Sequence, residues 1–337
     1  MIADWQLLHL PWDELFVVEG NYNGWRLDLY LTQKIHRASR SQITRILKSC
    51  DVRLNERPAR PADRVRAADT IRIARTERID PQTPSLDTVQ ILTDEHDVVI
   101  VDKPSGMLVH RTAGEVSRTV EAWTQTLDSP QRLDPTHRLD RETSGCLVLG
   151  RGLDRIRELR AVFDHSLATK TYLAVLDDIE QRWQPGCRRT FDTPLGDDTG
   201  SSIGLRMGPG NLPCATHVHC FDRRGRWALT AVNIDQGRQH QIRAHVALFG
   251  TPVAGDKLYG MGDAFFAQWL EAPGRPDLVQ QVAVRWHALH AWHIEVPVSS
   301  GVVVALAPIP ASITGLVGTI AFEPLFVRPV NTAMHGS

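Results

Sequence analysis

The chain has 337 residues, which at roughly 150 residues per domain predicts two domains. Hydrophobic residues make up 42% of it and charged residues 23%, so a disordered or fibrous protein is excluded. No apolar run approaches the ~18 residues of a membrane span, and residues 1–25 hold acidic side chains without Lys or Arg, unlike a signal or transit peptide. Five cysteines without paired spacing fit reduced thiols, so we expect a cytoplasmic protein.

The formal net charge of −1 conceals a basic segment near the start of the chain. Residues 26–80 contain 14 Lys and Arg against 7 Asp and Glu. A basic segment inside a near-neutral chain is typical of a module that binds a polyanion. The alternative interpretation is a solvated charged surface without a ligand.

A leader over residues 1–25 precedes this basic segment. The sequence pattern within the segment predicts two helices followed by two strands. Apolar residues recur at helical spacing from Leu27 to Ile35 and again from Ile43 to Cys50. Alternating residues at 52–55 and 70–73 fit strands with one apolar face. The other face of the second helix carries three cations that we expect to bind the polyanion: Arg40, Arg45 and Lys48.

Three short motifs in the basic segment carry a resemblance. They are Arg26-Leu27-Asp28, Ser39-Arg40-Ser41 and Val52-Arg53-Leu54-Asn55, in this order. The segment resembles the small RNA-binding domain shared with ribosomal protein S-four. The resemblance implies an RNA-binding domain of two helices and strands over residues 26–80.

A linker is predicted over residues 81–90, because two prolines with polar neighbours favour extended, exposed chain. Strands outnumber helices between residues 91 and 310 and do not alternate regularly with them. We therefore expect an α+β fold with a mixed or antiparallel sheet. Residues 311–337 are left as an unassigned C-terminal extension. The expected strands are 98–101, 146–149, 171–176, 216–221 and 227–234, and the expected helices are 156–163 and 238–249.

The densest group of polar residues is His137-Arg138-Leu139-Asp140-Arg141-Glu142-Thr143-Ser144-Gly145, directly before a buried strand. Arginines flank Asp140, and neighbouring cations keep a carboxylate ionised. A positioned, ionised carboxylate can act as a nucleophile or as a general base. The alternative is a structural aspartate in an ion-paired turn.

A second group runs from Gly237 to His245 and continues in Gly255-Asp256-Lys257-Leu258-Tyr259-Gly260. On a helix His240 and Arg243 would share one face, and an arginine there could pair with a carboxylate in a forked geometry. The alternative is an amphipathic helix with a solvated face.

Together these motifs resemble the RluA-type pseudouridine synthases. His137 to Gly145 is similar to that family's signature, H-R-L-D followed by a variable pair and T-S-G. Residues 237–245 and 255–260 resemble its later motif. Residues 101–106 with His110 resemble the strand and turn that open its catalytic domain, and residues 170–174 the segment with its active-site tyrosine. The resemblance runs from about residue 93 to residue 297, in the expected order.

The resemblance implies an isomerase that breaks the bond between uracil and ribose and rejoins the base through carbon, without metal or other cofactor. Asp140 would be the catalytic carboxylate, either attacking the anomeric carbon or removing the 2′ proton. Arg243 would hold it ionised, and Tyr172 would stack on the uracil. Arg138 would fill the space of the flipped base, whose extrusion costs a few kcal/mol. His137, Arg238 and His240 are further expected substrate-binding residues.

The expected substrate is structured ribosomal RNA, with transfer RNA as the alternative. We expect no membrane association and no obligate protein partner. Two other classes of function remain possible from the sequence. One is a non-catalytic RNA-binding or ribosome assembly factor, although Asp140, Tyr172 and Arg243 are all present. The other is a zinc enzyme, using His and Cys residues of the types that zinc favours: Cys214, His217, His219, Cys220, His287, His290 and His293.

Overall fold

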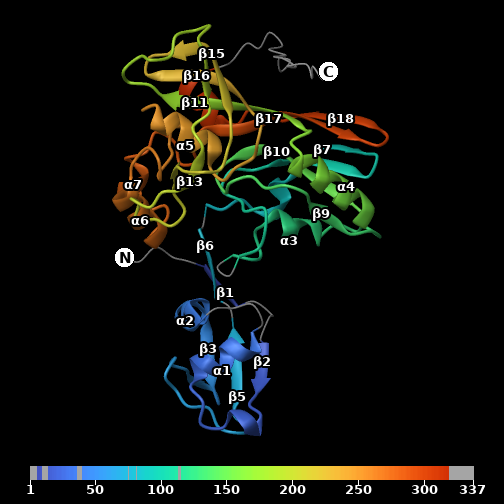
Figure 1. Ribbon diagram of the computed structural model, residues 1–337, viewed down its shortest axis with the longest axis vertical. Helices are drawn as coiled ribbons and strands as arrows, with labels where there is room; N and C mark the ends of the chain where they lie inside the picture. The colour runs from blue at the N-terminus through green and yellow to red at the C-terminus, as the bar shows by residue number, and fades with distance from the viewer. Residues whose placement is uncertain are drawn as a thin grey trace.

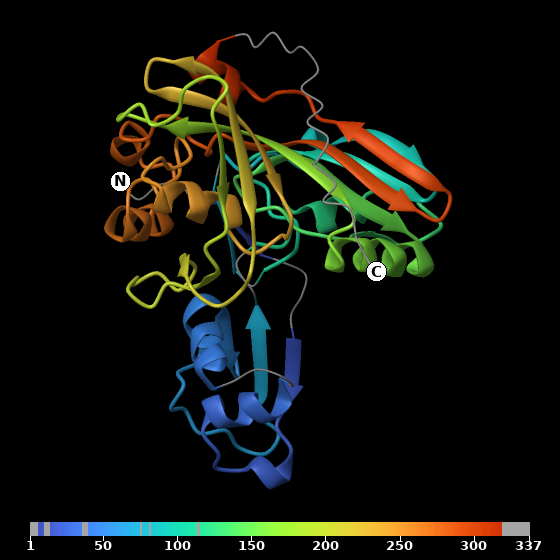
Figure 2. The ribbon, with the colours of Figure 1, turned by 45° about the horizontal axis from the view of Figure 1, so that its top comes forward.

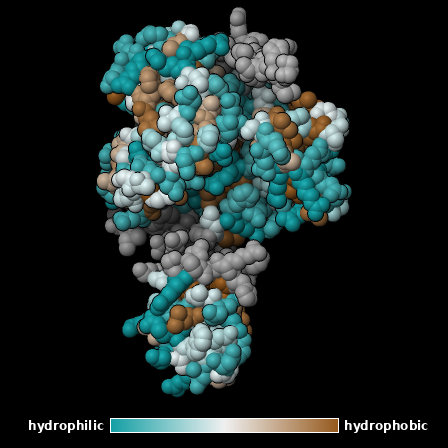
Figure 3. Space-filling model, in the orientation of Figure 1, coloured by the Kyte–Doolittle hydropathy of each residue, from teal (hydrophilic) through white to brown (hydrophobic). Residues whose placement is uncertain are grey.

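The computed structural model describes residues 6–9, 14–35, 40–74, 76–80, 82–112 and 115–318. A small unit from the N-terminal part of the chain lies below a larger, sheet-rich unit (Figure 1). Hydrophilic residues dominate the face of the molecule drawn in Figure 3, with hydrophobic residues in small scattered patches. Among the described helices, none has the length and apolar character needed to cross a membrane.

The small unit packs two helices on a four-stranded antiparallel sheet in the order β2-β5-β3-β4. Its core contains the apolar residues that the helical and alternating patterns predicted, including Leu27, Leu31, Ile43, Ile71 and Ile73. The elements are α1 (Leu27–Lys34), α2 (Arg40–Ser49), β2 (Glu14–Val17), β3 (Asp51–Leu54), β4 (Arg57–Pro58) and β5 (Thr70–Ala74), with a 3-10 turn η1 (Gly20–Tyr22).

Residues that precede the basic segment also form strands. Strand β2 comes from the region expected to be a leader, and it pairs with β5 through Phe16 and Ile71. Strand β1 (Gln6–His9) pairs with β6 (Thr76–Ile79) in a separate ribbon. The alternation that places Phe16 against the core was too short to recognise in the sequence.

The large unit is a ten-stranded sheet in the order β12-β15-β16-β11-β17-β10-β8-β7, with β18 paired to β17 and β9 to β10. Its pairs are antiparallel except for the parallel pair of β10 and β17, so the expected mixed sheet is confirmed. The sheet strands are β7 (Gln90–Glu95), β8 (Val98–Lys103), β9 (Leu133–Pro135), β10 (Ser144–Arg151), β11 (Thr169–Asp177), β12 (Arg188–Phe191), β15 (Thr216–Arg224), β16 (Trp227–Ile234), β17 (Leu289–Val298) and β18 (Gly301–Leu306).

Helices cover both faces of this sheet because successive strand residues point to opposite sides (Figure 2). On one face α5 packs Ile242 and Val246 against strand residues such as Leu147. On the other face α4 packs Leu159 against Val148, the next residue of β10. The remaining elements are α3 (Val120–Thr124), α4 (Leu153–Asp164), α5 (Gln241–Leu248), α6 (Asp263–Glu271), α7 (Pro276–Val279), α8 (Ala311–Val317), η2 (Leu86–Thr88), β13 (Leu195–Asp197) and β14 (Met207–Pro209).

Two sequence expectations need correction. The helix expected from residue 238 begins at Gln241, because His240 has a left-handed backbone with φ of 52° and cannot continue it. The segment expected to be an exposed linker is partly buried. Asp80 forms an ion pair with Arg285, at 2.7 Å, and the Thr83 carbonyl accepts a hydrogen bond from Arg118. The described start of the C-terminal extension is α8, which packs Ile313 on the sheet.

Candidate active site

Asp140 lies on the loop between β9 and β10, and its carboxylate faces a cleft with a side chain that is 20% exposed. The backbone beside it is anchored from the end of β8. The buried Lys103 ammonium donates hydrogen bonds to the carbonyls of Pro104, Met107 and Arg141, at 2.9, 2.8 and 3.1 Å. The three N–H groups of the Lys103 ammonium thus fix the backbone around Arg141, the residue that follows Asp140.

The Thr143-Ser144-Gly145 segment attaches the same loop to β17. The Thr143 hydroxyl lies 2.9 Å from His287 Nε2, and the Ser144 hydroxyl lies 2.8 Å from His290 Nδ1. Gly145 has φ of 104°, and a Cβ there would lie 2.2 Å from the Ala291 carbonyl oxygen. A glycine is therefore needed where β10 and β17 pair in parallel.

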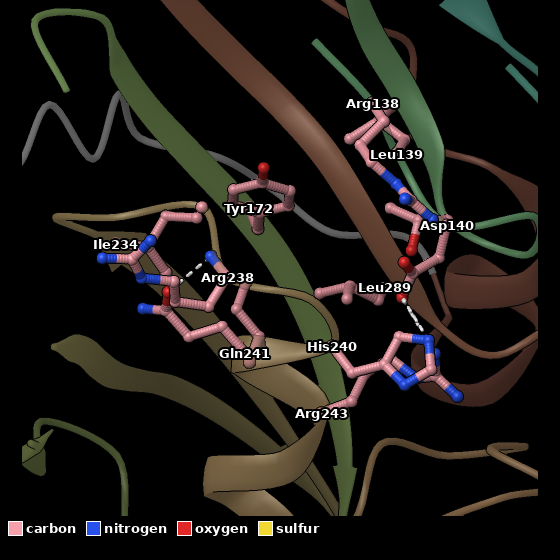
Figure 4. Close-up of a pocket in the computed structure, with 13 residues that line it drawn as sticks. Arg138, Leu139, Asp140, Tyr172, Ile234, Arg238, His240, Gln241, Arg243 and Leu289 are labelled. Atoms are coloured by element: carbon pink, nitrogen blue, oxygen red, sulfur yellow. Dashed lines mark hydrogen bonds and ion pairs between the residues drawn. The ribbon is translucent and has the colours of Figure 1, made fainter. Parts of the chain in front are cut away.

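Arg243, on the first turn of α5, joins two carboxylates. Its Nη1 donates to Asp140 Oδ2 at 2.9 Å, as the dashed line in Figure 4 shows. Its Nε and Nη2 donate to the two oxygens of Asp256, at 2.6 and 3.0 Å. The predicted pairing of Asp140 with Arg243 is therefore present, and a second aspartate shares the guanidinium.

The electrostatics of the cleft keep Asp140 ionised. Burial raises the pKa of this carboxyl, but the charge of Arg243 and its hydrogen bond act in the opposite direction, so the pKa lies below its ordinary value. Burial lowers the pKa of His240 to about 4, and the charge of Arg243 adds to this effect. His240 is therefore neutral at pH 7, with Nε2 3.8 Å from Asp140 Oδ2 and Nδ1 3.2 Å from the Tyr259 hydroxyl.

Tyr172 lines the cleft from β11, across the cavity from Asp140 (Figure 4). Burial raises the pKa of its phenol, and the charge of Asp140 raises it further, so the hydroxyl stays protonated. Apolar side chains of Leu139, Ile234 and Leu289 complete much of the wall. The cleft thus offers an aromatic ring and apolar surface opposite an ionised carboxylate.

The structure brings most of the other expected residues to this cleft. Arg138 and Arg238 lie on its exposed rim, on opposite sides in Figure 4, and His240 lies inside. His137 does not line the cleft. Its Nε2 accepts the Val148 amide at 3.0 Å and its ring packs on Phe163, which leaves it a structural role in the loop.

The three cations expected on the second helix lie in α2, away from this cleft (Figure 1). Arg40 is described in full: its Nη2 pairs with Asp28 Oδ2 at 3.1 Å, and its side chain is 60% exposed. The side chains of Arg45 and Lys48 lie outside the described residues.

Sequence reasoning missed the buried ion pairs behind the cleft. It noted the segments of Lys103, Asp256 and Lys257 without assigning these residues a role. Lys257 Nζ pairs with Glu142 Oε2 at 2.6 Å, so the turn at 255–260 also grips the Asp140 loop. The signal available was the occurrence of Lys and Asp inside otherwise apolar, glycine-punctuated segments, where charged residues are buried only when paired.

The histidines and cysteines considered as zinc ligands have other partners. His287 and His290 bond the loop hydroxyls, and His217 lies 3.0 Å from the Thr190 hydroxyl. His219 lies on β15 opposite Arg188 of β12, and the Cys214 thiol lies 3.8 Å from His245 Nε2. Over the described ranges, no three His, Cys, Asp or Glu side chains are grouped as a metal site.

This arrangement supports attack or proton removal by Asp140 on a planar group that is held against Tyr172. Asp140 accepts its hydrogen bond through Oδ2, and its Oδ1 has no hydrogen-bond partner among the described residues. A carboxylate oxygen without a partner, beside an aromatic ring, suits nucleophilic or general-base chemistry on a stacked base.

Comparison with known proteins agrees with this chemistry. Residues 97–248 match the RNA pseudouridylate synthase family. The chain is 30% identical over 264 residues to Ribosomal large subunit pseudouridine synthase C of Vibrio vulnificus, covering 74% of this chain and 82% of that protein. The chain belongs to this family. Its members are the RluA-type pseudouridine synthases, isomerases that act on RNA, as the sequence motifs predicted.

Other members of the family show similar extents of match. Ribosomal large subunit pseudouridine synthase D of Xanthomonas campestris is 29% identical over 314 residues, covering 90% of this chain and 91% of that protein. Among solved structures, Human RNA Pseudouridylate Synthase Domain Containing 1 matches with a TM-score of 0.53 and 21% identity, covering 69% of this chain and 88% of that chain. The likeness shows that the sheet-rich unit has the pseudouridine synthase fold.

Proposed function

We propose that this pseudouridine synthase isomerises uridine in ribosomal RNA of the large subunit, with Asp140 as the catalytic carboxylate. The observation that supports this most is the cleft itself, in which an ionised aspartate, tethered by Arg243, faces Tyr172. The named function of the Vibrio vulnificus and Xanthomonas campestris relatives supports the choice of RNA.

The proposed roles follow from position. Asp140 forms or breaks bonds at the ribose, as nucleophile or as base, and Arg243 holds it. The Tyr172 ring stacks on the extruded uracil, an interaction worth ~1–3 kcal/mol per base. Arg138 and Arg238, exposed on two sides of the rim, contact the RNA around the flipped nucleotide, and His240 contacts the substrate inside the cleft.

We also propose that the small unit is an RNA-binding domain of the ribosomal protein S-four type. Its two helices, the basic segment over residues 26–80 and the exposed Arg40 support this assignment. Residues 14–17 belong with it because β2 completes its sheet. The catalytic domain would follow from residue 91, after the linker at 81–90. Phosphate contacts from this domain would position the RNA without reading its sequence.

The proposed compartment is the cytoplasm, where unpaired cysteines are stable. All five cysteines of the chain are described, and none of them forms a disulfide. Reduced thiols are typical of cytosolic proteins.

The test is release of tritium from RNA that is labelled at carbon five of uracil. Unmodified large-subunit ribosomal RNA and transfer RNA are assayed separately, with wild type and Asp140→Asn. We expect release from ribosomal RNA by wild type and none by the variant. Release from transfer RNA alone would overturn the choice of substrate. Release by Asp140→Asn at the wild-type rate would overturn the assignment of the carboxylate.

A further inference from the structure

Asp256 is bound so fully that it fixes the orientation of Arg243. Its Oδ1 accepts the backbone amides of Leu258 and Tyr259, each at 3.0 Å, and Arg243 Nη2 at 3.0 Å. Its Oδ2 accepts Arg243 Nε at 2.6 Å. The carboxylate is buried and accepts four hydrogen bonds, three of them through Oδ1. It therefore has no freedom to follow a guanidinium that moves.

The flat face of the Arg243 guanidinium also has a partner. Its central carbon lies 5.1 Å from the centre of the Tyr259 ring, within the range of a cation–π contact. The Tyr259 hydroxyl is fixed in turn, because it accepts the Met207 amide at 2.9 Å. One turn of the chain, residues 256–259, thus supplies both an edge partner and a face partner for Arg243.

This arrangement decides how Asp140 is held. The Nε and Nη2 edge of Arg243, which would otherwise pair with a carboxylate through two parallel bonds, is occupied by Asp256. Asp140 meets the guanidinium at Nη1, and the contact is made through Oδ2 alone. Asp140 Oδ1 has no hydrogen-bond partner among the described residues, and Asp140 lines the cleft together with Tyr172.

The same turn grips the Asp140 loop at a second point. Lys257, next to Asp256, pairs with Glu142 Oε2 at 2.6 Å and contacts the Arg285 carbonyl. The Glu142 carboxylate also accepts the His287 amide at 3.1 Å. The Asp140 loop and Arg243 are thus both held by the same turn of the chain. Residues 256 and 257 together therefore set the distance between Asp140 and Arg243.

We propose that Asp256 is a positioning residue for pseudouridine formation: by holding the Nε and Nη2 edge of Arg243 it fixes the guanidinium in the orientation in which Nη1 bonds Asp140 Oδ2 and Oδ1 is left to react. The inference rests on the proposed function. It assigns Asp256 no contact with RNA, because the residue is buried behind Arg243 and does not line the cleft.

The experiment compares Asp256→Asn with a matched control in the full-length protein. Asparagine keeps the shape and can still accept the two backbone amides, but its NH2 group cannot accept from Arg243. The control is Asp178→Asn. Asp178 is equally buried, accepts the amides of Arg182 and Trp183 and pairs with Arg223, but lies after the end of β11 outside the cleft.

We expect kcat for tritium release to fall about 100-fold in Asp256→Asn, the scale of a small misplacement of a reacting group, with KM for RNA within about twofold of wild type. Asp178→Asn should keep the wild-type kcat, whatever its thermal midpoint. In an Arg243→Lys background, adding Asp256→Asn should cost less than about twofold, because both changes act through one guanidinium.

Three outcomes would overturn the inference: an unchanged kcat in Asp256→Asn, a loss expressed in KM alone, or an equal loss of kcat in Asp178→Asn. A full additional loss in the Arg243→Lys background would show that Asp256 acts by another route. Failure of the wild type to release tritium is a separate result and would refute the proposed function instead.

Discussion

At the scale of single residues, the active-site region is a set of buried charges that are each satisfied by a specific partner. Asp140 and Asp256 share Arg243, and Glu142 pairs with Lys257. Buried carboxylates of this kind are stable only when paired, and removing one partner leaves the other uncompensated at a cost of about 3–5 kcal/mol. Folding and the proposed catalysis therefore depend on the same residues here.

Buried histidines beside these pairs predict how stability changes with pH. Burial lowers the pKa of His240, His287 and His290 from 6.5 to about 4. Between these values the unfolded chain binds protons that the folded chain does not, so folding stability falls as the pH falls from about 6.5 towards 4. Each histidine contributes a slope of up to about 1.4 kcal/mol per pH unit.

Urea unfolding at pH 7 and pH 5 measures this effect. We expect a lower free energy of unfolding at pH 5, and a smaller difference between the two values in His290→Asn, which removes one of the three groups. The paired carboxylates do not confound the result, since their lowered pKa values place their effect below about pH 4. Asp102, whose pKa burial raises to about 6, has the opposite pH dependence over this range, so the decisive quantity is the change caused by His290→Asn. A difference between pH 7 and pH 5 equal to that of wild type would show that His290 titrates normally.

At the scale of elements, the parallel contact of β10 with β17 positions the loop that carries Asp140. Gly145 is the point of closest approach, since a side chain there would run into the Ala291 carbonyl. Gly145→Ala should therefore separate the two strands and disturb the Thr143 and Ser144 hydrogen bonds to His287 and His290.

Gly186→Ala is the control for Gly145→Ala. Gly186 also has a positive φ, of 87°, but nothing lies within 4 Å of its missing Cβ. The Gly186→Ala variant should lose only about 1–2 kcal/mol of stability, because of backbone strain. Gly145→Ala should lose more stability, together with most of its tritium-release activity. Thermal denaturation of the two variants tests this prediction. Equal midpoints would show that β10 and β17 accommodate a side chain at residue 145 without loss of stability.

Elements were predictable from the sequence where one face is apolar and regular. The strands at 98–101 and 146–149 and the helix at 156–163 gave clear patterns and are present as β8, β10 and α4. The start of α5 was misplaced by three residues because His240 adopts a left-handed backbone, which a polar sequence does not reveal. Strand β2 was missed because its partner β5 lies more than 50 residues away in the chain.

The candidate site was likewise only partly predictable from the sequence. Through their resemblance to a known family, the motifs placed Asp140, Tyr172 and Arg243 in one site, and these residues line one cleft. They could not show that Asp256 takes part in the Arg243 pairing, because this depends on how the turn at 255–260 folds back on α5. His137 stands beside Arg138 in sequence, yet its ring turns away from the cleft towards Phe163.

At the scale of the whole molecule, the uneven distribution of charge predicts that the two units have different roles in binding RNA. The basic small unit should supply non-specific affinity for RNA, which weakens with salt by a log–log slope of about −0.7 per phosphate contacted on single strands. A chain that begins at Asp80 keeps the ion pair to Arg285 and should remain folded. Filter binding across a salt series should show weaker RNA binding and a shallower slope for this shortened chain.

Circular dichroism of the shortened chain is the control for that comparison. A folded chain with unchanged affinity and slope would contradict the role of the small unit. Loss of the folded signal would show instead that the two units depend on each other for stability.

The central claim is that Asp140 performs the chemistry and is not required for holding RNA. The direct test is the single-turnover rate of pseudouridine formation in large-subunit ribosomal RNA, measured for wild type and Asp140→Asn with RNA affinity determined on the same samples. The account predicts affinity within about twofold and a rate reduced by about 10⁴ or more, as for the loss of other essential catalytic groups. A variant that binds RNA normally and forms pseudouridine at the wild-type rate would contradict it.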